Sequence, residues 1–256
     1  MAVSASASGQ QSKADLAELR SRIEKDLREA PAPLTIAWPG QAISVPSAFG
    51  GKYGVIGFGF GLQNRVRFRT GKADGVFGAV VPVGDPVNAI GLDIALSIYD
   101  ISDFGNRGSA DFMVHKRFGD SALAAGYERA VPWGISDSDR SVYVVGSHLV
   151  RLRPLRSEPF SRLSVSLGVG NGRFQSEQDA IAEKNGLNVF GSASINIHPQ
   201  ANVFAEWTGQ DINLGTSIVP LKGIPLNVTA ALADVTGSAG DGIRFLFGIG
   251  YTVRFK

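Results

Sequence analysis

The sequence of 256 residues contains no cysteine at all. Without cysteine the chain can form no disulfide, no thiolate nucleophile and no zinc site with sulfur ligands. No uncharged apolar run of 18 or more residues occurs either, which excludes a transmembrane helix. The net charge is only +2, and no basic stripe interleaves with aromatic residues. Nucleic acid is therefore not an expected partner.

Histidine is scarce, and the residues of known catalytic motifs are missing. The three histidines, His115, His148 and His198, show no spacing that suits a metal site. Ser147 and His148 are neighbours in one predicted strand, so their side chains point to opposite faces. No Gly-x-Ser-x-Gly elbow is present, and the glycine-rich stretches GFGFG and GVGNG neither open a helix nor precede a Walker lysine. The sequence predicts no enzyme, no metal and no cofactor.

Glycine, in contrast, is abundant, with 32 residues, and from about residue 53 the chain alternates between apolar and small or polar residues. The pattern is clear in residues 56–62, 90–98, 163–169, 226–232 and 245–255. Period two over about ten residues is typical of a strand, and ten residues is the length that a tilted strand needs to cross a bilayer. Division of the region in this way predicts about twelve strands.

The predicted connections alternate between short turns and mostly longer, polar loops. The short set is GDPVN, GDS, RPLRSEP, HPQA and PLKG, and the set between them includes QNRVRFRTGKADG and NGRFQSEQDAIAEKNG. Transmembrane barrels show this order, with short periplasmic turns and longer extracellular loops. We therefore predict an all-β fold, a closed antiparallel up-and-down transmembrane β-barrel. An even strand number places both termini on the periplasmic side.

The N-terminal part differs from the rest. Residues 1–11 are expected to be disordered or a processing remnant: either an export signal has been replaced by the starting Met, which we favour, or none existed. Residues 12–30 have helical periodicity and end before prolines, so they predict a short amphipathic α-helix that docks, forms a coiled coil or plugs the barrel. Residues 31–50 are expected to be an extended linker, and residues 51–256 the barrel.

The end of the chain carries a resemblance. The stretch YTVRF resembles the C-terminal signal of bacterial outer-membrane β-barrel proteins of the porin-like kind, although Lys256 follows where the aromatic residue is usually last. The resemblance implies that Tyr251 and Phe255 are read by the barrel-assembly machinery. The stretches VPSAFGGKYG, NVFGS, EWTGQDINLGTSIVP and LADVTG resemble an uncharacterised family of predicted cyanobacterial outer-membrane proteins over residues 44–255. This second likeness implies location and fold, not activity.

In such a barrel the aromatic face of the last strand contacts outer-membrane lipid and the Gly/Thr/Arg face lines the lumen. Aromatic residues near strand ends are candidates for an interfacial girdle: Trp133, Phe160, Phe174, Trp207 and Tyr251.

The inward residues are mostly small, which favours a narrow, weakly selective pore for small solutes or ions. The charged pore-lining candidates are Asp93, Arg151, Glu206, Arg244 and Arg254, and the excess of arginine predicts a slight anion preference. Two alternatives stay open: a structural or receptor-like barrel without an open pore, and a soluble β-barrel that carries an apolar ligand. The sequence leaves the solute and the oligomeric state undetermined.

Overall fold

The structure is a computed structural model, and the chain forms two compact units, Met1–Leu34 and Thr35–Lys256. The structure describes residues 16, 18, 21, 37, 42–66, 73–99, 104–134, 140–176, 178–179, 182, 184, 186–237, 239 and 242–255. In the first unit Leu16, Glu18 and Ser21 are helical. The remainder of the predicted helix and residues 1–11 lie outside the described residues.

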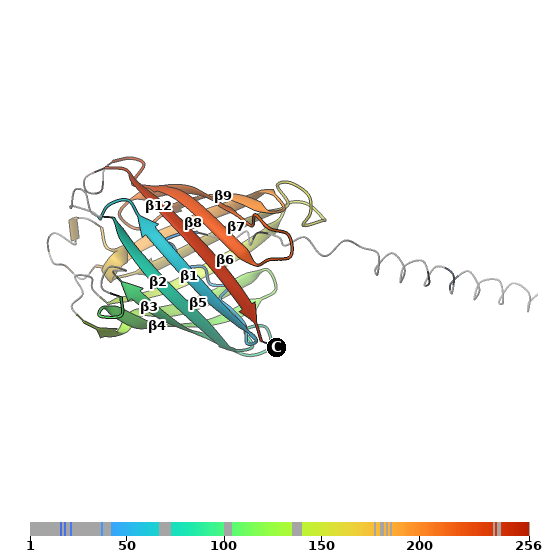
Figure 1. The fold of residues 1–256 in the computed structure, drawn as a ribbon, viewed down its shortest axis with the longest axis horizontal. Coiled ribbons are helices and arrows are strands. Elements are labelled where there is room, and N and C mark those ends of the chain that lie inside the picture. Colours follow the sequence, from blue (N-terminus) through green and yellow to red (C-terminus); the bar gives the residue numbers. More distant parts are fainter. Residues whose placement is uncertain are drawn as a thin grey trace, which may run out of the picture. The chain divides into compact units, whose positions relative to one another are not determined.

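The second unit is a closed antiparallel barrel of twelve strands, as the sequence predicts (Figure 1). Each strand pairs with its neighbours in the sequence, and β1 pairs with β12 to close the ring. The strands are β1 Val55–Gln63, β2 Asp74–Gly84, β3 Gly91–Tyr99, β4 Gly108–Phe118, β5 Ser121–Trp133, β6 Ser141–Arg151, β7 Arg162–Gly170, β8 Asn188–His198, β9 Ala201–Trp207, β10 Ile212–Ile218, β11 Leu226–Ala233 and β12 Arg244–Arg254.

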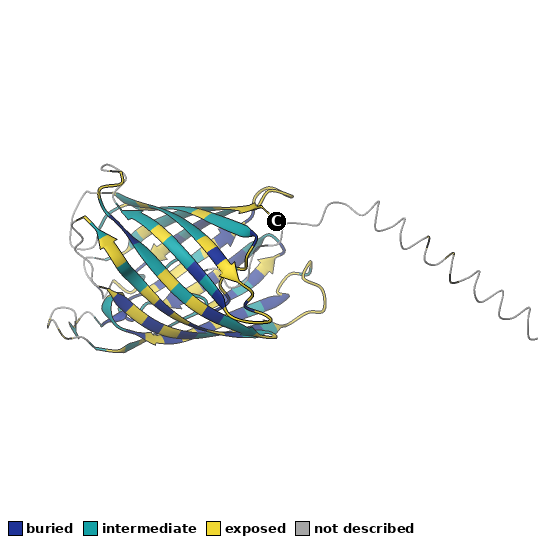
Figure 2. Cartoon of the chain, turned by 90° about the horizontal axis from the view of Figure 1, so that it is seen from below, coloured by how far each residue is buried: buried dark blue, intermediate teal, exposed yellow. Residues whose placement is uncertain are grey.

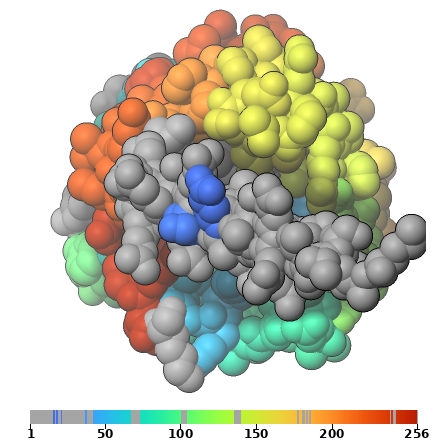
Figure 3. Space-filling model, turned by 90° about the vertical axis from the view of Figure 1, so that its right-hand side faces the viewer, coloured from blue at the N-terminus to red at the C-terminus, as the bar shows by residue number. Residues whose placement is uncertain are grey.

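The even number of strands brings the start of β1 and the end of β12 to one end of the barrel, where Val55 and Arg254 are register partners. Figure 3 views this end, where the last strand, in red, lies beside the first, in light blue. We call it the turn end, because four of its connections, β2–β3, β4–β5, β8–β9 and β10–β11, are short. The opposite, loop end carries the longer connections. The expected alternation fails at two places, since the β6–β7 connection is long and the β9–β10 connection is short.

Along strands such as β6, β7 and β9 buried and exposed residues alternate (Figure 2), and the exposed residues on the outer face are mostly apolar. In β7, Leu167 is 63% exposed on the outer face, whereas Ser164 and Ser166 are buried on the lumen face. Every strand contributes an exposed apolar residue to the outer face: Phe58, Val81, Leu96, Val114, Leu123, Val144, Leu167, Val189, Val203, Leu214, Leu232 and Phe245.

Charge is confined to the lumen face and the ends of the barrel. The described outward positions of the strands hold no acidic residue or arginine, and only one lysine and two histidines: Lys116, His148 and His198. All three lie beside turn-end connections. Lys116 Nζ donates to Val87 O, His148 Nδ1 is 2.8 Å from Ser121 Oγ, and His198 Nδ1 accepts a hydrogen bond from the Gln200 N–H at 3.3 Å. Between the two ends the outer face of the barrel is therefore uncharged and predominantly apolar.

The hydrophobic core lies inside the barrel. Phe174 stacks on Phe190 with ring centroids 4.1 Å apart, and Tyr143 meets both rings edge-on. The prediction that Phe174 belongs to an interfacial girdle is wrong, because it is fully buried in the lumen. It ends a 3₁₀ helix, Gly172–Phe174, whose first residue has φ +60°, and this turn directs the ring inward.

The lumen is tightly packed beside β7 and open beside β1. A Cβ on Gly168 would approach Phe190 Cζ to 2.3 Å and the carbonyl oxygen of Val144 to 2.6 Å, whereas a Cβ on Gly59 would meet nothing within 4 Å.

We therefore expect Gly168→Ala to lower the free energy of unfolding by about 1–3 kcal/mol, the usual cost of overpacking. The matched variant Gly59→Ala should leave it unchanged. Urea unfolding followed by circular dichroism measures both. Equal losses at the two positions would contradict the uneven packing of the lumen.

Candidate functional site in the barrel lumen

A segment without regular secondary structure, residues 42–51, packs against lumen-facing side chains of the barrel. We call it the inner strap. Its residues Val45, Ala48 and Phe49 are buried in the same cluster as Tyr143 and Phe190. The segment falls largely within the predicted linker, but it fills part of the lumen.

The first anchor of the inner strap is a buried carboxylate. Glu206 in β9 is 2% exposed and points into the lumen. Its oxygens accept hydrogen bonds from the backbone N–H groups of Ile43 (3.2 Å), Ser44 (3.1 Å) and Val45 (3.1 Å), and from Asn213 Nδ2 (2.8 Å). Three consecutive N–H groups thus converge on one carboxylate. Such charge-assisted bonds compensate the burial of the charge and of the strap's backbone.

Two further anchors lie along the strap. Ser147 Oγ in β6 accepts a hydrogen bond from the Ala48 N–H at 2.9 Å. Asp93 in β3 accepts one from the Gly51 N–H at 3.0 Å, and its other oxygen is 3.2 Å from Nε2 of the buried His115. The strap is therefore tied to strands on several sides of the barrel.

The strap's carbonyl side is held by an arginine. Arg173 Nη1 donates to Ser44 O at 2.7 Å, and the same guanidinium pairs with Glu128, its Nη2 donating to Oε1 at 2.7 Å. Arg117 lies over the ring of Phe49, 5.2 Å from its centroid. The barrel thus binds the strap in three ways: it accepts hydrogen bonds from backbone N–H groups, donates one to a backbone carbonyl, and places a guanidinium over an aromatic ring.

The part of the lumen beside β1 is hollow. A cavity of about 510 Å³ is bordered by the strap and by β1, β2, β3, β11 and β12, and a second of about 350 Å³ adjoins it. Five residues border both cavities: Gly59, Gly78, Ser97, Asn227 and Gly250. Together the cavities follow β1 from Gln63 near the loop end to Gly57 near the turn end. We call this space the glycine passage.

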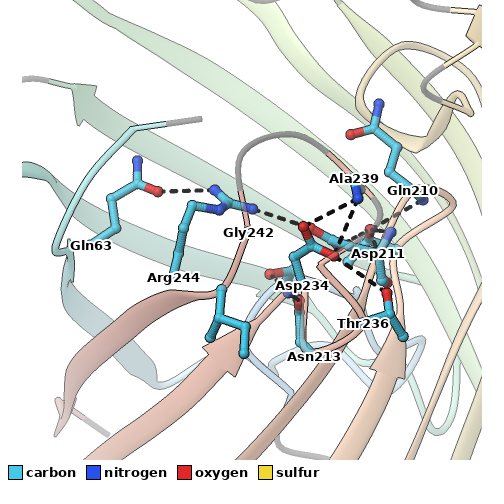
Figure 4. A network of polar contacts seen from close by, with 12 residues as sticks. Gln63, Gln210, Asp211, Asn213, Asp234, Thr236, Ala239, Gly242 and Arg244 are labelled. Carbon is cyan, nitrogen blue, oxygen red and sulfur yellow. Dashed lines mark hydrogen bonds and ion pairs between the residues drawn. The ribbon is translucent and has the colours of Figure 1, made fainter. Parts of the chain in front are cut away.

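A network of polar contacts connects neighbouring strands and connections at the loop end of the barrel (Figure 4). Arg244 donates to Gln63 Oε1 at 3.3 Å and to Asp211 Oδ2 at 3.1 Å. Asn213 Oδ1 accepts a hydrogen bond from the N–H of Asp234, a residue with φ +53° at the start of the β11–β12 connection. Because Asn213 also binds the glutamate that anchors the strap, the rim and the strap share one network.

The charged residues predicted to line a pore fall into two groups. Asp93 and Glu206 anchor the strap, and Arg244 belongs to the loop-end network. Arg151 and Arg254 lie instead at the turn end and are exposed.

The turn-end arginine of β6 has its own partner. Arg151 Nη2 is 2.7 Å from Asp120 Oδ1, and its side chain is 64% exposed. This hydrogen bond holds the pKa of the Asp120 carboxyl below its usual value. Arg151 is thus a rim residue with a neighbouring counter-charge.

The two residues of the predicted assembly signal lie near the seam of the barrel. Tyr251 is exposed on the outer face of β12 and pairs in register with Phe58 of β1. The Phe255 N–H donates to Gly54 O at 3.1 Å, and its ring meets Tyr53 edge-on at 5.6 Å. Recognition by an assembly machinery stays a prediction.

The inner strap was missed by sequence reasoning, and so were Asn213 and His115, which contact its anchors Glu206 and Asp93. The strap has no periodicity, and its anchors are single polar residues on separate strands. The one available signal is the apolar set Val45, Ala48 and Phe49 ahead of the first strand.

Within the described residues, no group of three or more His, Asp or Glu side chains is placed to hold a metal ion. No helix in that part of the chain is long and apolar enough to cross a membrane.

Comparison with known proteins shows a likeness to solved structures but to no protein family. No protein-family model and no curated protein matches this chain. A solved structure, the crystal structure of the Acinetobacter baumannii outer membrane protein Omp33, is similar with 11% sequence identity and a TM-score of 0.36. The match covers 79% of this chain and 98% of that chain. The resemblance to predicted cyanobacterial proteins gains no support from these comparisons.

The Glu206 anchor can be tested with the variant Glu206→Gln. The substitution keeps the size of the side chain but replaces one carboxylate oxygen by an NH₂ group, which cannot accept hydrogen bonds from the strap's backbone N–H groups. We expect the free energy of unfolding to fall by about 1–3 kcal/mol, the cost of leaving buried donors unsatisfied. We also expect faster proteolysis within residues 42–51. The control is Glu158→Gln in the exposed β6–β7 connection, which should change neither. Equal protease resistance of the Glu206 variant and the wild type would show that the strap does not depend on this anchor.

Proposed function

We propose that this chain is an outer-membrane β-barrel that forms a narrow passage for small solutes. The observation that carries the membrane assignment is the reversed polarity of the barrel, with an outer face that is predominantly apolar and uncharged between its two ends. A soluble protein rarely exposes an apolar patch of more than a few hundred Å². In a bilayer the same face is favourable, and closure of the barrel pairs every strand edge, as hydrocarbon requires.

The strand dimensions support the same location. A tilted strand needs about 9–11 residues to cross a bilayer. Nine of the twelve strands contain 9–13 residues, and β9, β10 and β11 are shorter, with 7, 7 and 8. The soluble carrier is disfavoured, because its apolar faces would have to point inward. We propose that the turn end faces the periplasm, as in barrels of this class. The proposed partners are outer-membrane lipid and an assembly machinery that reads Tyr251 and Phe255.

The glycine passage favours a pore over a closed structural barrel. The inner strap and the aromatic cluster occupy the lumen beside β4–β9, so the space that remains lies along the glycine-rich wall. Its two adjoining cavities extend along most of β1. Barrels of about eight strands are filled by side chains and those of 16–18 hold wide channels, so a strapped barrel of twelve strands suits a narrow one.

The lipid-facing assignment predicts opposite results for two arginine substitutions. Leu167→Arg places a charge in lipid and should cost roughly 2–4 kcal/mol near the midplane. Gly248→Arg points into the glycine passage, where a new Cβ has no contact shorter than 3.8 Å, and should fold while narrowing the passage. The folded fraction in phospholipid vesicles, read from heat-modifiable gel mobility, measures both. Failure of the Gly248 variant alone would mean that the two faces are reversed.

The pore itself can be tested by conductance in planar bilayers. The purified protein should give small, discrete current steps. Removal of residues 1–34 leaves the strap in place, whereas removal of residues 1–50 deletes nearly all of it. The steps of the second truncated chain should therefore be several-fold larger than those of the first. Each truncated chain is first checked for heat-modifiable mobility. Folded barrels that stay electrically silent with and without the strap would support the structural or receptor-like alternative.

A further inference from the structure

The charges expected to act on a permeating ion are engaged away from the glycine passage. Asp93 and Glu206 bind the backbone of the inner strap, and Arg244 pairs with Asp211, which is 3% exposed. Arg151 lies at the turn end beside Asp120. Arg254 is exposed at the turn end, where β12 ends. None of the three arginines that predict an anion preference borders the two cavities of the passage.

The wall of the passage is itself almost free of charge. Among the described residues that border the two cavities, Asp74 is the single acidic or basic one. It lies at the loop end of β2, where Gln63 Nε2 donates to its Oδ2 at 3.3 Å. From this point toward the turn end the inward positions of β1 and β12 are mainly glycine.

The polar groups that remain are neutral. Ser97, Asn227 and Thr229 bring hydroxyl and amide groups to the same wall, each paired in register with a glycine of the neighbouring strand. An ion that loses part of its hydration in a narrow space needs a counter-charge, whereas an uncharged polar solute needs only hydrogen bonds. The larger cavity, about 510 Å³, is in the size range of small-molecule sites, about 300–1,000 Å³.

We infer that the glycine passage conducts small uncharged polar solutes, of the size and chemistry of short polyols, in preference to ions. The inference rests on the proposed pore and specifies its solute class. It replaces the anion preference with near-equal, weak permeation of cations and anions.

The test adds one charge to the middle of the passage. Gly59 faces the lumen, and a Cβ there meets no atom within 4 Å, so Gly59→Asp introduces a carboxylate without steric conflict. Gly59→Asn has nearly the same volume and no charge, and is the matched control. All three proteins are reconstituted in vesicles, where swelling in erythritol reports neutral permeation, and in planar bilayers, where the potassium-to-chloride permeability ratio is measured in a KCl gradient.

We expect erythritol swelling with the wild type and a permeability ratio near one. Gly59→Asp should raise the ratio and the potassium conductance several-fold, and Gly59→Asn should change neither. A wild-type ratio far from one, or equal ratios for the two variants, would overturn the inference while leaving the pore in place. Neither swelling nor conductance with any of the folded proteins would overturn the proposed pore itself.

Discussion

The pairing of β1 with β12 is the interaction on which the rest of the structure depends. It converts an open sheet into a ring, so that no strand edge is left with unpaired backbone groups. Only a closed ring allows the outer face to be apolar throughout without inviting edge-to-edge association. The same closure encloses an interior, which holds the inner strap on one side and the glycine passage on the other. The apolar exterior and the enclosed lumen thus both depend on this pairing.

The interior is divided unevenly. On one side large rings such as Phe174 and Phe190 pack with the inner strap, and on the other a glycine wall leaves space. The strap stays inside because its backbone groups find partners on strands that are distant in sequence, above all the Glu206 carboxylate. A buried charge and a buried stretch of irregular backbone are each costly alone, and each satisfies the other. This mutual dependence makes the strap part of the fold.

The uneven interior also decides the electrostatics of the passage. The sequence predicts five charged pore-lining residues and a slight anion preference, yet Asp93, Glu206 and Arg244 are bound to the strap or to the loop-end network. Charged residues that could have created an electric field in the glycine passage therefore act as structural anchors. What remains along the passage is a neutral wall of glycine, hydroxyl and amide groups, which is why we assign it to uncharged solutes.

The amino-acid sequence by itself determined the barrel. Period-two alternation is a local property that fixes the face of each strand residue, and in β7 the lumen-facing residues are buried at every second position. The sequence also determined that Asp93 and Glu206 point inward. Tertiary structure alone decided what they bind, since the strap lies more than 150 residues from Glu206 in the chain. It likewise decided that Phe174 is buried, because a short 3₁₀ turn, and not strand periodicity, directs that ring. Contacts between irregular backbone and single polar side chains have no period, so only the folded chain reveals them.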